Sequence, residues 1–175
     1  MKYFYTDTLE SERLVTKFLT LEYSEQWTEF FEDPQAIEYL PNPGFPSSGE
    51  RAEDWINKQI TRYSNRYYGL QALHNKKTGE FIGQCGLLFQ IVDNEWEVEV
   101  GYHILKKHWG QGYAPEAAKL FIDFAFRNEL SDNIISIINI DNLRSQRVAN
   151  KNKLERIKQT SWNGLDVFIY QLGKQ

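Results

Sequence analysis

A glycine-rich turn between a strand-like and a helix-like segment carries the clearest chemical pattern in the sequence. Residues 105–116 read LKKHWGQGYAPE. Gly110 and Gly112 permit a tight turn that approaches a ligand closely, and Ala114 keeps the helix start near the strand. Free backbone N–H groups at a helix start, reinforced by the helix dipole, bind phosphate without a charged side chain. The pattern indicates an anion site, although two glycines alone are equally compatible with a simple change of chain direction.

Two other phosphate-binding motifs do not fit this turn. A Walker loop requires Gly-Lys-Ser/Thr, which the sequence lacks. A dinucleotide fingerprint requires its glycines after the first strand of a strand–helix–strand unit. Here the preceding segments are spaced as antiparallel hairpins, so a dinucleotide-binding fold is disfavoured.

Two glutamates mark a possible acid–base site just before the turn. Glu97 and Glu99 alternate with apolar residues in a segment typical of a central strand. A carboxylate in a strand covered on both faces is costly unless it is hydrogen-bonded or lies in a cleft. Glu99, and less strongly Glu97, is therefore a candidate for proton transfer. The alternative is that either side chain faces solvent at a strand edge.

A third polar pair and the metal-binding residue types complete the chemical inventory. Asn142 is placed to cap the next helix, with Ser145 three residues further on, and a helix start beside a cleft points polar groups into it. The three histidines and the single cysteine, Cys85, lack the spacing of a metal site, so no metal is predicted. His103 is interpreted as a strand packing residue rather than a base, and Cys85 as a buried apolar side chain.

The elements that position these residues follow from periodicity and turn signals. The predicted strands are Glu12–Leu19, Tyr67–His74, Phe81–Val92, Glu95–Leu105, Asn133–Ile140, Arg156–Trp162 and Asp166–Leu172. Asp93-Asn94 and Asn163-Gly164 are predicted as the tight turns of two hairpins. The predicted helices are Glu22–Glu32 and a long helix capped by Ser47 or Ser48, both with an apolar stripe, then one running from Pro115 through Leu130, and Leu143–Leu154. The prolines of Pro41–Pro46 exclude helix and central strand. This order predicts a mixed α/β sheet with helices on both faces.

Length and composition limit the class of protein. A chain of 175 residues corresponds to one domain, here residues 1–175. The net charge of −4 argues against a nucleic-acid partner. No apolar run is long enough to span a membrane or to form a signal peptide, and one cysteine suits a reducing compartment. The sequence therefore predicts a cytoplasmic protein.

Three segments together resemble the GNAT superfamily of N-acetyltransferases, in its RimJ/RimL-like branch. They are EVGYHI at residues 99–104, WGQGYAPEA at 109–117 and NLRSQRVANK at 142–151. The resemblance covers nearly the whole chain and implies a mostly antiparallel sheet of about seven strands, splayed at a cofactor cleft. Two positions depart from the family pattern. Trp109 replaces a Gln or Arg, and Asn152-Lys153 replaces x-Gly after the last helix, where Asn152 is expected to adopt the left-handed conformation.

The resemblance also implies which residues act. Acetyl-CoA would be the co-substrate, its pantetheine arm pairing with the strand that ends at His103, Ile104 and Leu105. The amides of Gln111, Gly112, Tyr113 and Ala114 in the turn would hold its pyrophosphate, and Trp109, Gly110 and Asn142 would also contact the cofactor. Glu99 would handle the amine proton, and Ser145 would donate a proton toward the departing thiolate. Many GNAT enzymes use a tyrosine in this last helix, and residues 143–154 contain none.

The resulting hypothesis is direct acetyl transfer from acetyl-CoA to a primary amine, because no activated Ser or Cys nucleophile is evident. The acceptor would be a protein N-terminus or a small-molecule amine, with no nucleic acid or membrane partner, and the protein a monomer or homodimer. Substrate selection is expected from Asn42–Pro46 and the aromatic first helix. One alternative is a non-catalytic acyl-CoA-binding regulatory module. The other is an interaction domain whose glycine turn binds nothing.

Overall fold

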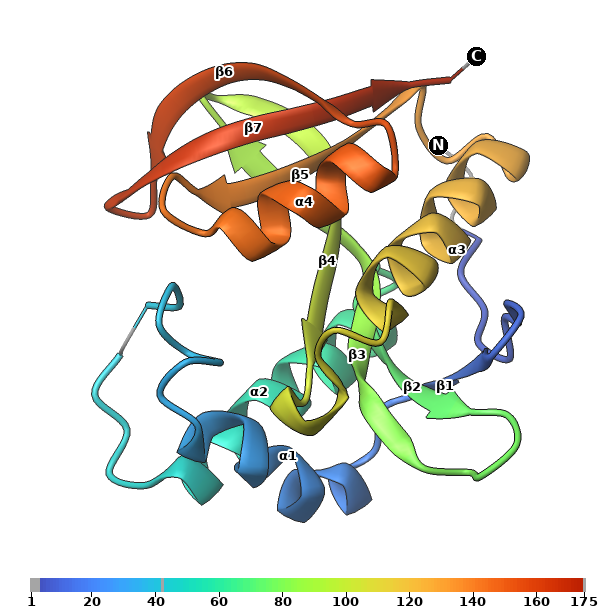
Figure 1. Cartoon of the computed structure of the whole chain (residues 1–175), viewed down its shortest axis with the longest axis vertical. Coiled ribbons are helices and arrows are strands. Elements are labelled where there is room, and N and C mark those ends of the chain that lie inside the picture. The colour runs from blue at the N-terminus through green and yellow to red at the C-terminus, as the bar shows by residue number, and fades with distance from the viewer. Residues whose placement is uncertain (1–3, 42, 175) are drawn as a thin grey trace.

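The computed structural model describes residues 4–41 and 43–174, and these form a seven-stranded sheet flanked by helices (Figure 1). Asn42, within the predicted proline-rich loop, lies outside the described residues. The strands are β1 (Leu14–Phe18), β2 (Leu70–Asn75), β3 (Phe81–Val92), β4 (Glu95–Ile104), β5 (Asn133–Asn139), β6 (Glu155–Trp162) and β7 (Leu165–Gly173). The helices are α1 (Ser24–Glu32), α2 (Ser48–Ser64), α3 (Tyr113–Arg127) and α4 (Leu143–Lys151), with 3-10 turns η1 (Leu21–Tyr23) and η2 (Lys106–His108). This confirms the predicted mixed α/β class.

The sheet order is β1-β2-β3-β4-β5-β7-β6, and every neighbouring pair is antiparallel except β4 and β5. In the described part of the chain, the register of that parallel pair consists of Glu99 opposite Ile135 alone. Figure 1 shows the consequence: β5, β6 and β7 diverge from the lower part of β4. The edge of β4 beyond Glu99 therefore lacks a strand partner on the β5 side.

Two apolar cores cover the two faces of the sheet. Helices α1 and α2 bury Trp27, Phe30 and Ile56 against one face, whereas α3 buries Phe121 among residues of the other face. Both helices of the first pair show the predicted apolar stripe, and Ser47 is the N-cap of α2, its side chain accepting from the backbone N–H of Glu50. The central strands are thus covered on both sides, which makes any polar side chain on them conspicuous.

Tight turns confirm the two predicted hairpins. Asp93 and Asn94 join β3 to β4 with φ of 50° and 68°, and Asn163 and Gly164 join β6 to β7 with φ of 50° and 78°. Positive φ at both central residues is the turn that matches the twist of an antiparallel pair. Both hairpins were recognisable because Asn, Asp and Gly tolerate this conformation.

Three helices end without the glycine that commonly marks a helix C-terminus. In α2, α3 and α4 the residue after the C-cap adopts a left-handed conformation and is not glycine: Arg66 (φ 57°), Glu129 (φ 55°) and Lys153 (φ 62°). At each site two backbone N–H groups bond back to the last turn, as in the bond from Leu130 to Ala125. The helix predicted to reach Leu130 therefore ends at Arg127.

The end of α4 and the start of α3 also differ from the predicted boundaries. The helix predicted to reach Leu154 ends at Lys151, and Lys153 rather than Asn152 takes the left-handed conformation, since Asn152 has φ of −91°. At the start of α3, Gly112 with φ of 81° is the N-cap, so the helix begins at Tyr113 and Pro115 still lies in its first turn. No helix in the described part of the chain is long and apolar enough to cross a membrane.

Candidate active site

A cavity of about 560 Å³ opens where β4 and β5 separate. Its walls come from β4, the glycine turn, the start of α3, β5, α4 and the segment following α1. Most of the predicted site residues line it: Glu99, His103, Ile104, Trp109, Gly110, Gly112, Tyr113, Ala114, Asn142 and Ser145. Leu105 and Gln111 do not. Leu105 is buried in the α1–α2 core, and Gln111 directs its carbonyl to Arg13 and its side-chain amide to the Lys107 carbonyl.

The glycine turn presents its backbone to the cavity. Gly110 and Gly112 have φ of 75° and 81°, a conformation that other residues adopt at a cost of about 1–2 kcal/mol. The N-cap Gly112 has no side chain to cap α3, and within the described residues the amides from Gly110 to Ala114 have no acceptor in the protein. A helix start with free amides at a cavity wall is an anion-binding arrangement.

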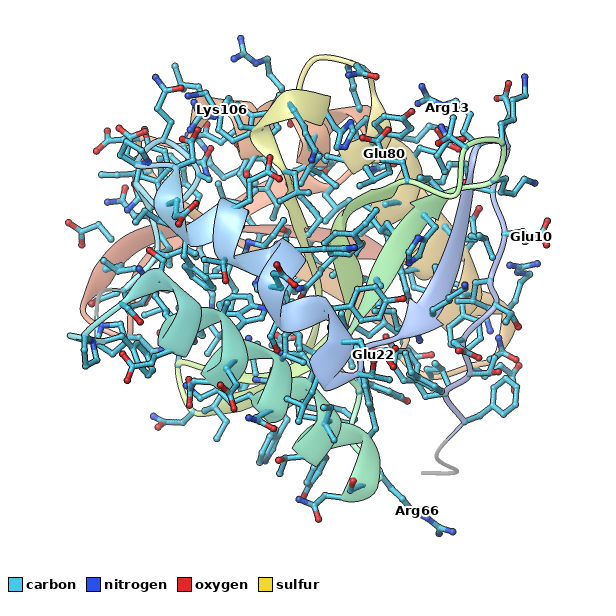
Figure 2. The ribbon with its side chains drawn as sticks, turned by 90° about the horizontal axis from the view of Figure 1, so that it is seen from below. Glu10, Arg13, Glu22, Arg66, Glu80 and Lys106 are labelled. Atoms are coloured by element: carbon cyan, nitrogen blue, oxygen red, sulfur yellow. The ribbon has the colours of Figure 1, made fainter. Side chains whose placement is uncertain are left out.

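Arg13, which directly precedes β1, contacts this turn and holds it in place. Its guanidinium donates to the Gln111 carbonyl at 2.9 Å and to Glu116 at 2.7 Å, and it stacks on the Tyr113 ring at 4.4 Å. The Gln111 carbonyl and the Gly112 N–H belong to the same trans peptide, so they point in opposite directions. Because the carbonyl faces Arg13, the N–H points away from Arg13. Figure 2 shows Arg13 at the end of β1, on the same edge of the view as Glu80 and Lys106.

Glu116, in the first turn of α3, completes this brace. Its carboxylate accepts from the Ser11 hydroxyl at 2.7 Å, the Arg13 backbone N–H at 2.8 Å and the Arg13 side chain. Burial alone would raise the pKa of Glu116, but these hydrogen bonds and the Arg13 charge together lower it below its usual value. The carboxylate thus stays ionised at the positive end of the helix.

Helix α4 forms the opposite wall. The Asn142 side chain accepts from the Ser145 backbone N–H at 3.1 Å, so the predicted cap is confirmed. Arg144 stacks over the Trp109 ring at 4.4 Å, and the Trp109 indole donates to the Ile104 carbonyl at 2.8 Å. Two further basic residues of α4, Arg147 and Lys151, line the cavity.

Glu99 is a buried carboxylate at the inner end of the cavity, with 8% of its surface exposed. It accepts from the Gln90 side chain at 2.7 Å and from the Ile137 backbone N–H at 3.4 Å. Burial raises the pKa of Glu99, and the two hydrogen bonds and the charge of Arg62 offset part of that effect. Glu97, by contrast, is half-buried, does not line the cavity and bonds to the Asn133 side chain.

His103 shares the Glu99 face of β4, with Gly101 between them. Its ring packs edge-on against Trp55 and Phe30, at centroid distances of 5.0 and 5.6 Å. Burial lowers the pKa of His103 to about 4, so the ring is neutral at physiological pH. The predicted packing contacts are present, and the side chain also lines the cavity.

Several cavity and bracing residues were not identified from the sequence. They are Arg13, Tyr102, Ser136, Arg144, Arg147 and Lys151. Alternation along β4 places Tyr102 on the face opposite Glu99, and this alternation is the sequence signal that points to it. No group of His, Cys, Asp and Glu suited to a metal ion occurs within the described residues.

Comparison with known proteins agrees with this geometry. The family model of the GNAT acetyltransferase domain matches residues 13–155. The chain is 32% identical over 121 residues to YkkB of Bacillus subtilis (strain 168), covering 69% of each protein. It is 26% identical over 180 residues to N-acetyltransferase p20 of Bacillus licheniformis, covering 97% of each.

Solved structures match the fold along almost the whole chain. The RimL ribosomal L7/L12 α-N-protein acetyltransferase in complex with coenzyme A superposes with a TM-score of 0.77 at 16% identity, over 96% of this chain and 98% of that one. The microcin C7 self-immunity acetyltransferase MccE in complex with acetyl-CoA and AMP has a TM-score of 0.78 at 14% identity, over 95% and 98%. At these identities the likeness shows the fold.

The chain therefore belongs to the GNAT acetyltransferase family. It is an acyltransferase that depends on acetyl-CoA as co-substrate.

Proposed function

We propose that the protein transfers an acetyl group directly from acetyl-CoA to a primary amine that enters the cavity beside Glu99. One observation carries this proposal: a single cavity joins the anion-binding turn to a buried carboxylate, through the gap between β4 and β5. A non-catalytic acyl-CoA-binding module would need the turn and the gap, but it would not need a carboxylate desolvated at the inner end.

The donor half of the cavity extends from the turn to the unpaired edge of β4. The free amides at the start of α3 would hold the pyrophosphate, and Arg147 and Lys151 would add positive charge nearby. The backbone of residues 103–105 would pair with the pantetheine arm where no strand partner takes its place. Asn142 already caps α4, and this cap would fix the helix wall against which the cofactor lies.

The chemistry at the inner end requires a neutral amine and a stabilised leaving group. We assign Glu99 to take the proton that the amine loses, directly or through one water. Its raised pKa supports this role, because a base closer to neutrality both accepts and releases a proton readily. The role of Ser145 as proton donor toward the thiolate stays a prediction from the sequence, supported by its place on the cavity wall.

The acceptor would enter between His103 and the segment Asp33–Leu40, here named the acceptor wall. Ala36, Tyr39 and Leu40 of that wall line the cavity, as does Phe30 of α1. The predicted RimJ/RimL-like branch favours a protein N-terminus, and the fold likeness to MccE is equally consistent with a small-molecule amine. We therefore keep both acceptor classes, and the predicted cytoplasmic location stays a prediction.

Calorimetric titration with acetyl-CoA tests the donor site. The wild-type protein should bind at one site, and Gly112→Trp should abolish binding by distorting the turn, because a side chain there meets Arg13 and strains the φ of 81°. Gly164→Trp is the matched control, because Gly164 has a similar φ of 78° and lies in the β6–β7 hairpin. Folded wild-type protein that does not bind acetyl-CoA would overturn the proposal.

A panel of amines then tests transfer, with thiol release as the readout. It should include a peptide with a free serine or alanine N-terminus, a blocked peptide, an arylalkylamine and a polyamine. Turnover with one acceptor class, lost in Glu99→Gln while acetyl-CoA still binds, is the expected result. Binding without turnover on any amine would favour the non-catalytic module.

A further inference from the structure

Three hydroxyl groups gather where β4 and β5 begin to separate. Tyr102 of β4, Ser136 of β5 and Ser145 of α4 all line the cavity. The Tyr102 hydroxyl donates to the Ser145 backbone carbonyl at 3.1 Å, and the Ser136 hydroxyl lies 3.5 Å from the Val100 carbonyl. In Figure 1, α4 lies beside β5 and close to the upper end of β4.

These hydroxyls and Glu99 flank the strand gap from opposite faces. Successive side chains of a strand point to opposite faces of the sheet. Those of Glu99 and His103 therefore point toward α1 and α2, where His103 meets Trp55. Val100 and Tyr102 point the other way, and Val100 belongs to the core beneath α3. A carbonyl carbon held in the gap would therefore have a carboxylate on one side and hydroxyls on the other. Acyl transfer needs this separation of the entering amine from the departing group.

We propose that Tyr102 is a catalytic residue whose hydroxyl donates a hydrogen bond to the coenzyme A sulfur as the thiolate leaves. This inference rests on the proposed function. The carbon–nitrogen bond forms, the carbon–sulfur bond breaks, and its electron pair goes to sulfur. The amine proton goes to Glu99 and then to solvent, and the thiolate takes its proton from solvent. Tyr102 keeps its own proton throughout, so the products are the N-acetyl amine and the thiol.

The surroundings of Tyr102 suit a permanent donor. Burial raises the pKa of Tyr102 well above its usual value, an effect that hydrogen bonding to Ser145 and Ser136 only partly offsets. The hydroxyl thus stays protonated across physiological pH. If the Tyr102 hydroxyl rotates from the Ser145 carbonyl to the sulfur, that carbonyl keeps a hydrogen-bond donor, because it also accepts the regular helix bond within α4.

The contact with Ser145 is made by its main chain, which separates the two candidate donors experimentally. Ser145→Ala removes the serine hydroxyl and keeps the carbonyl that holds Tyr102. Tyr102→Phe removes the phenol and keeps the ring. Tyr170→Phe is the matched control, because the Tyr170 hydroxyl contacts the Gln146 side chain at 3.3 Å and Tyr170 does not line the cavity.

The test is a pH titration of bound coenzyme A, following the ultraviolet absorbance of its thiolate in each protein. Calorimetry with coenzyme A and thermal unfolding first establish binding and folding. We expect the pKa of the bound thiol to be about one pH unit higher in Tyr102→Phe, because a hydrogen bond to a charged acceptor is lost. Tyr170→Phe should match the wild type, and Ser145→Ala tests the serine as the alternative donor. With any acceptor found, kcat of Tyr102→Phe should fall about 10- to 100-fold, with KM for acetyl-CoA unchanged.

Each other result overturns the assignment. An unchanged thiol pKa in Tyr102→Phe removes the proposed hydrogen bond, and a shift in Ser145→Ala instead makes the serine the donor. A folded Tyr102→Phe protein that no longer binds coenzyme A would make Tyr102 a binding residue. Failure of the wild type to bind coenzyme A would instead overturn the proposed function.

Discussion

Two walls of the cavity, the glycine turn and the acceptor wall, are held in place by different kinds of contact. The glycine turn is held by glycine conformations and by the half-buried Arg13–Glu116 pair, in which the Glu116 side chain is 16% exposed. The acceptor wall packs Ala36, Ile37 and Leu40 against the α1–α2 core, whereas its contacts with α4 are made by exposed side chains. Arg144 donates to the Gln35 carbonyl at 3.1 Å and lies 3.5 Å from Glu38, with 43% and 50% of the two side chains exposed.

This difference matches what each wall has to do. The acetyl-CoA phosphates have one shape, so a rigid backbone cradle suits them, and rigidity lowers the entropy lost on binding. Acceptors vary, and exposed ion pairs are worth little, so the acceptor wall can change its contacts at small cost. Glu99 and Tyr102 lie between the walls on β4, where both substrates meet.

Glu99→Gln should produce the largest change, and it tests whether the chemistry is separate from both walls. Transfer should fall by about 10²- to 10⁴-fold because the base is lost, while acetyl-CoA affinity stays within twofold. The melting temperature at neutral pH should rise. Since burial raises the folded-state pKa of Glu99, its ionised form opposes folding above that pKa, and glutamine removes the cost.

The pH dependence of this stabilisation provides the check. The difference in melting temperature between Glu99→Gln and wild type should be largest above the folded-state pKa. It should vanish as the pH falls below the usual carboxyl range, where Glu99 is protonated in both states. A variant that is less stable than wild type at neutral pH would mean that the carboxylate is a structural element.

Glu116→Ala should give the next largest effect, on stability and on the donor site together. It leaves the Arg13 guanidinium and backbone N–H and the Ser11 hydroxyl without their shared acceptor, which costs about 2–3 kcal/mol. Acetyl-CoA affinity should fall about tenfold because the Gln111–Gly112 peptide is no longer held in place. Calorimetry and thermal unfolding measure the two effects. Asp123→Ala, which removes an exposed ion pair with Lys119 on the same helix, is the control.

Acid should weaken the contacts of Glu116 with Arg13 and Ser11 in the wild type. Because the folded-state pKa of Glu116 is lowered, its contribution is complete above the usual glutamate pKa of about 4.3 and is lost as the pH falls through the folded-state value. The stability gap between wild type and Glu116→Gln should therefore be constant near neutrality and narrow under acid. A gap that widens as the pH falls would contradict the lowered pKa.

The parts that the sequence predicted are those governed by local rules. The β3 and β4 boundaries followed from Asp93-Asn94, and the phosphate turn followed from Gly110 and Gly112 between a strand and a helix. The predicted ends of α3 and α4 were wrong because Glu129 and Lys153 adopt a left-handed conformation that glycine normally takes at a helix end. Both side chains are exposed, and the helices are closed by backbone hydrogen bonds from Leu130 to Ala125 and from Leu154 to Ala149, so these ends form without glycine.

The site contacts that were missed are long-range. Arg13 and Glu116 are 103 residues apart, and Tyr102 meets Ser145 across 43 residues. Alternation gave the face of each side chain, but it could not show that β5 leaves β4 immediately after Glu99. The acceptor wall has neither periodicity nor a turn signal, so nothing local placed Tyr39 or Leu40 at the cavity.

Arg144→Ala should have the smallest effect, and it tests whether the two walls are coupled. Arg144 contacts the Gln35 carbonyl on one wall and the Trp109 ring on the other. Because these contacts are exposed and the acceptor wall keeps its packing on the α1–α2 core, the KM for the amine should rise about three- to fivefold, the melting temperature should barely change, and acetyl-CoA affinity should stay within twofold. Arg144→Lys keeps the charge and loses the planar stacking surface, so it should restore part of the amine KM only if the ion pair with Glu38 matters. A tenfold loss of acetyl-CoA affinity in Arg144→Ala would show instead that Trp109 transmits changes between the walls, because the ring stacked beneath Arg144 directly precedes Gly110.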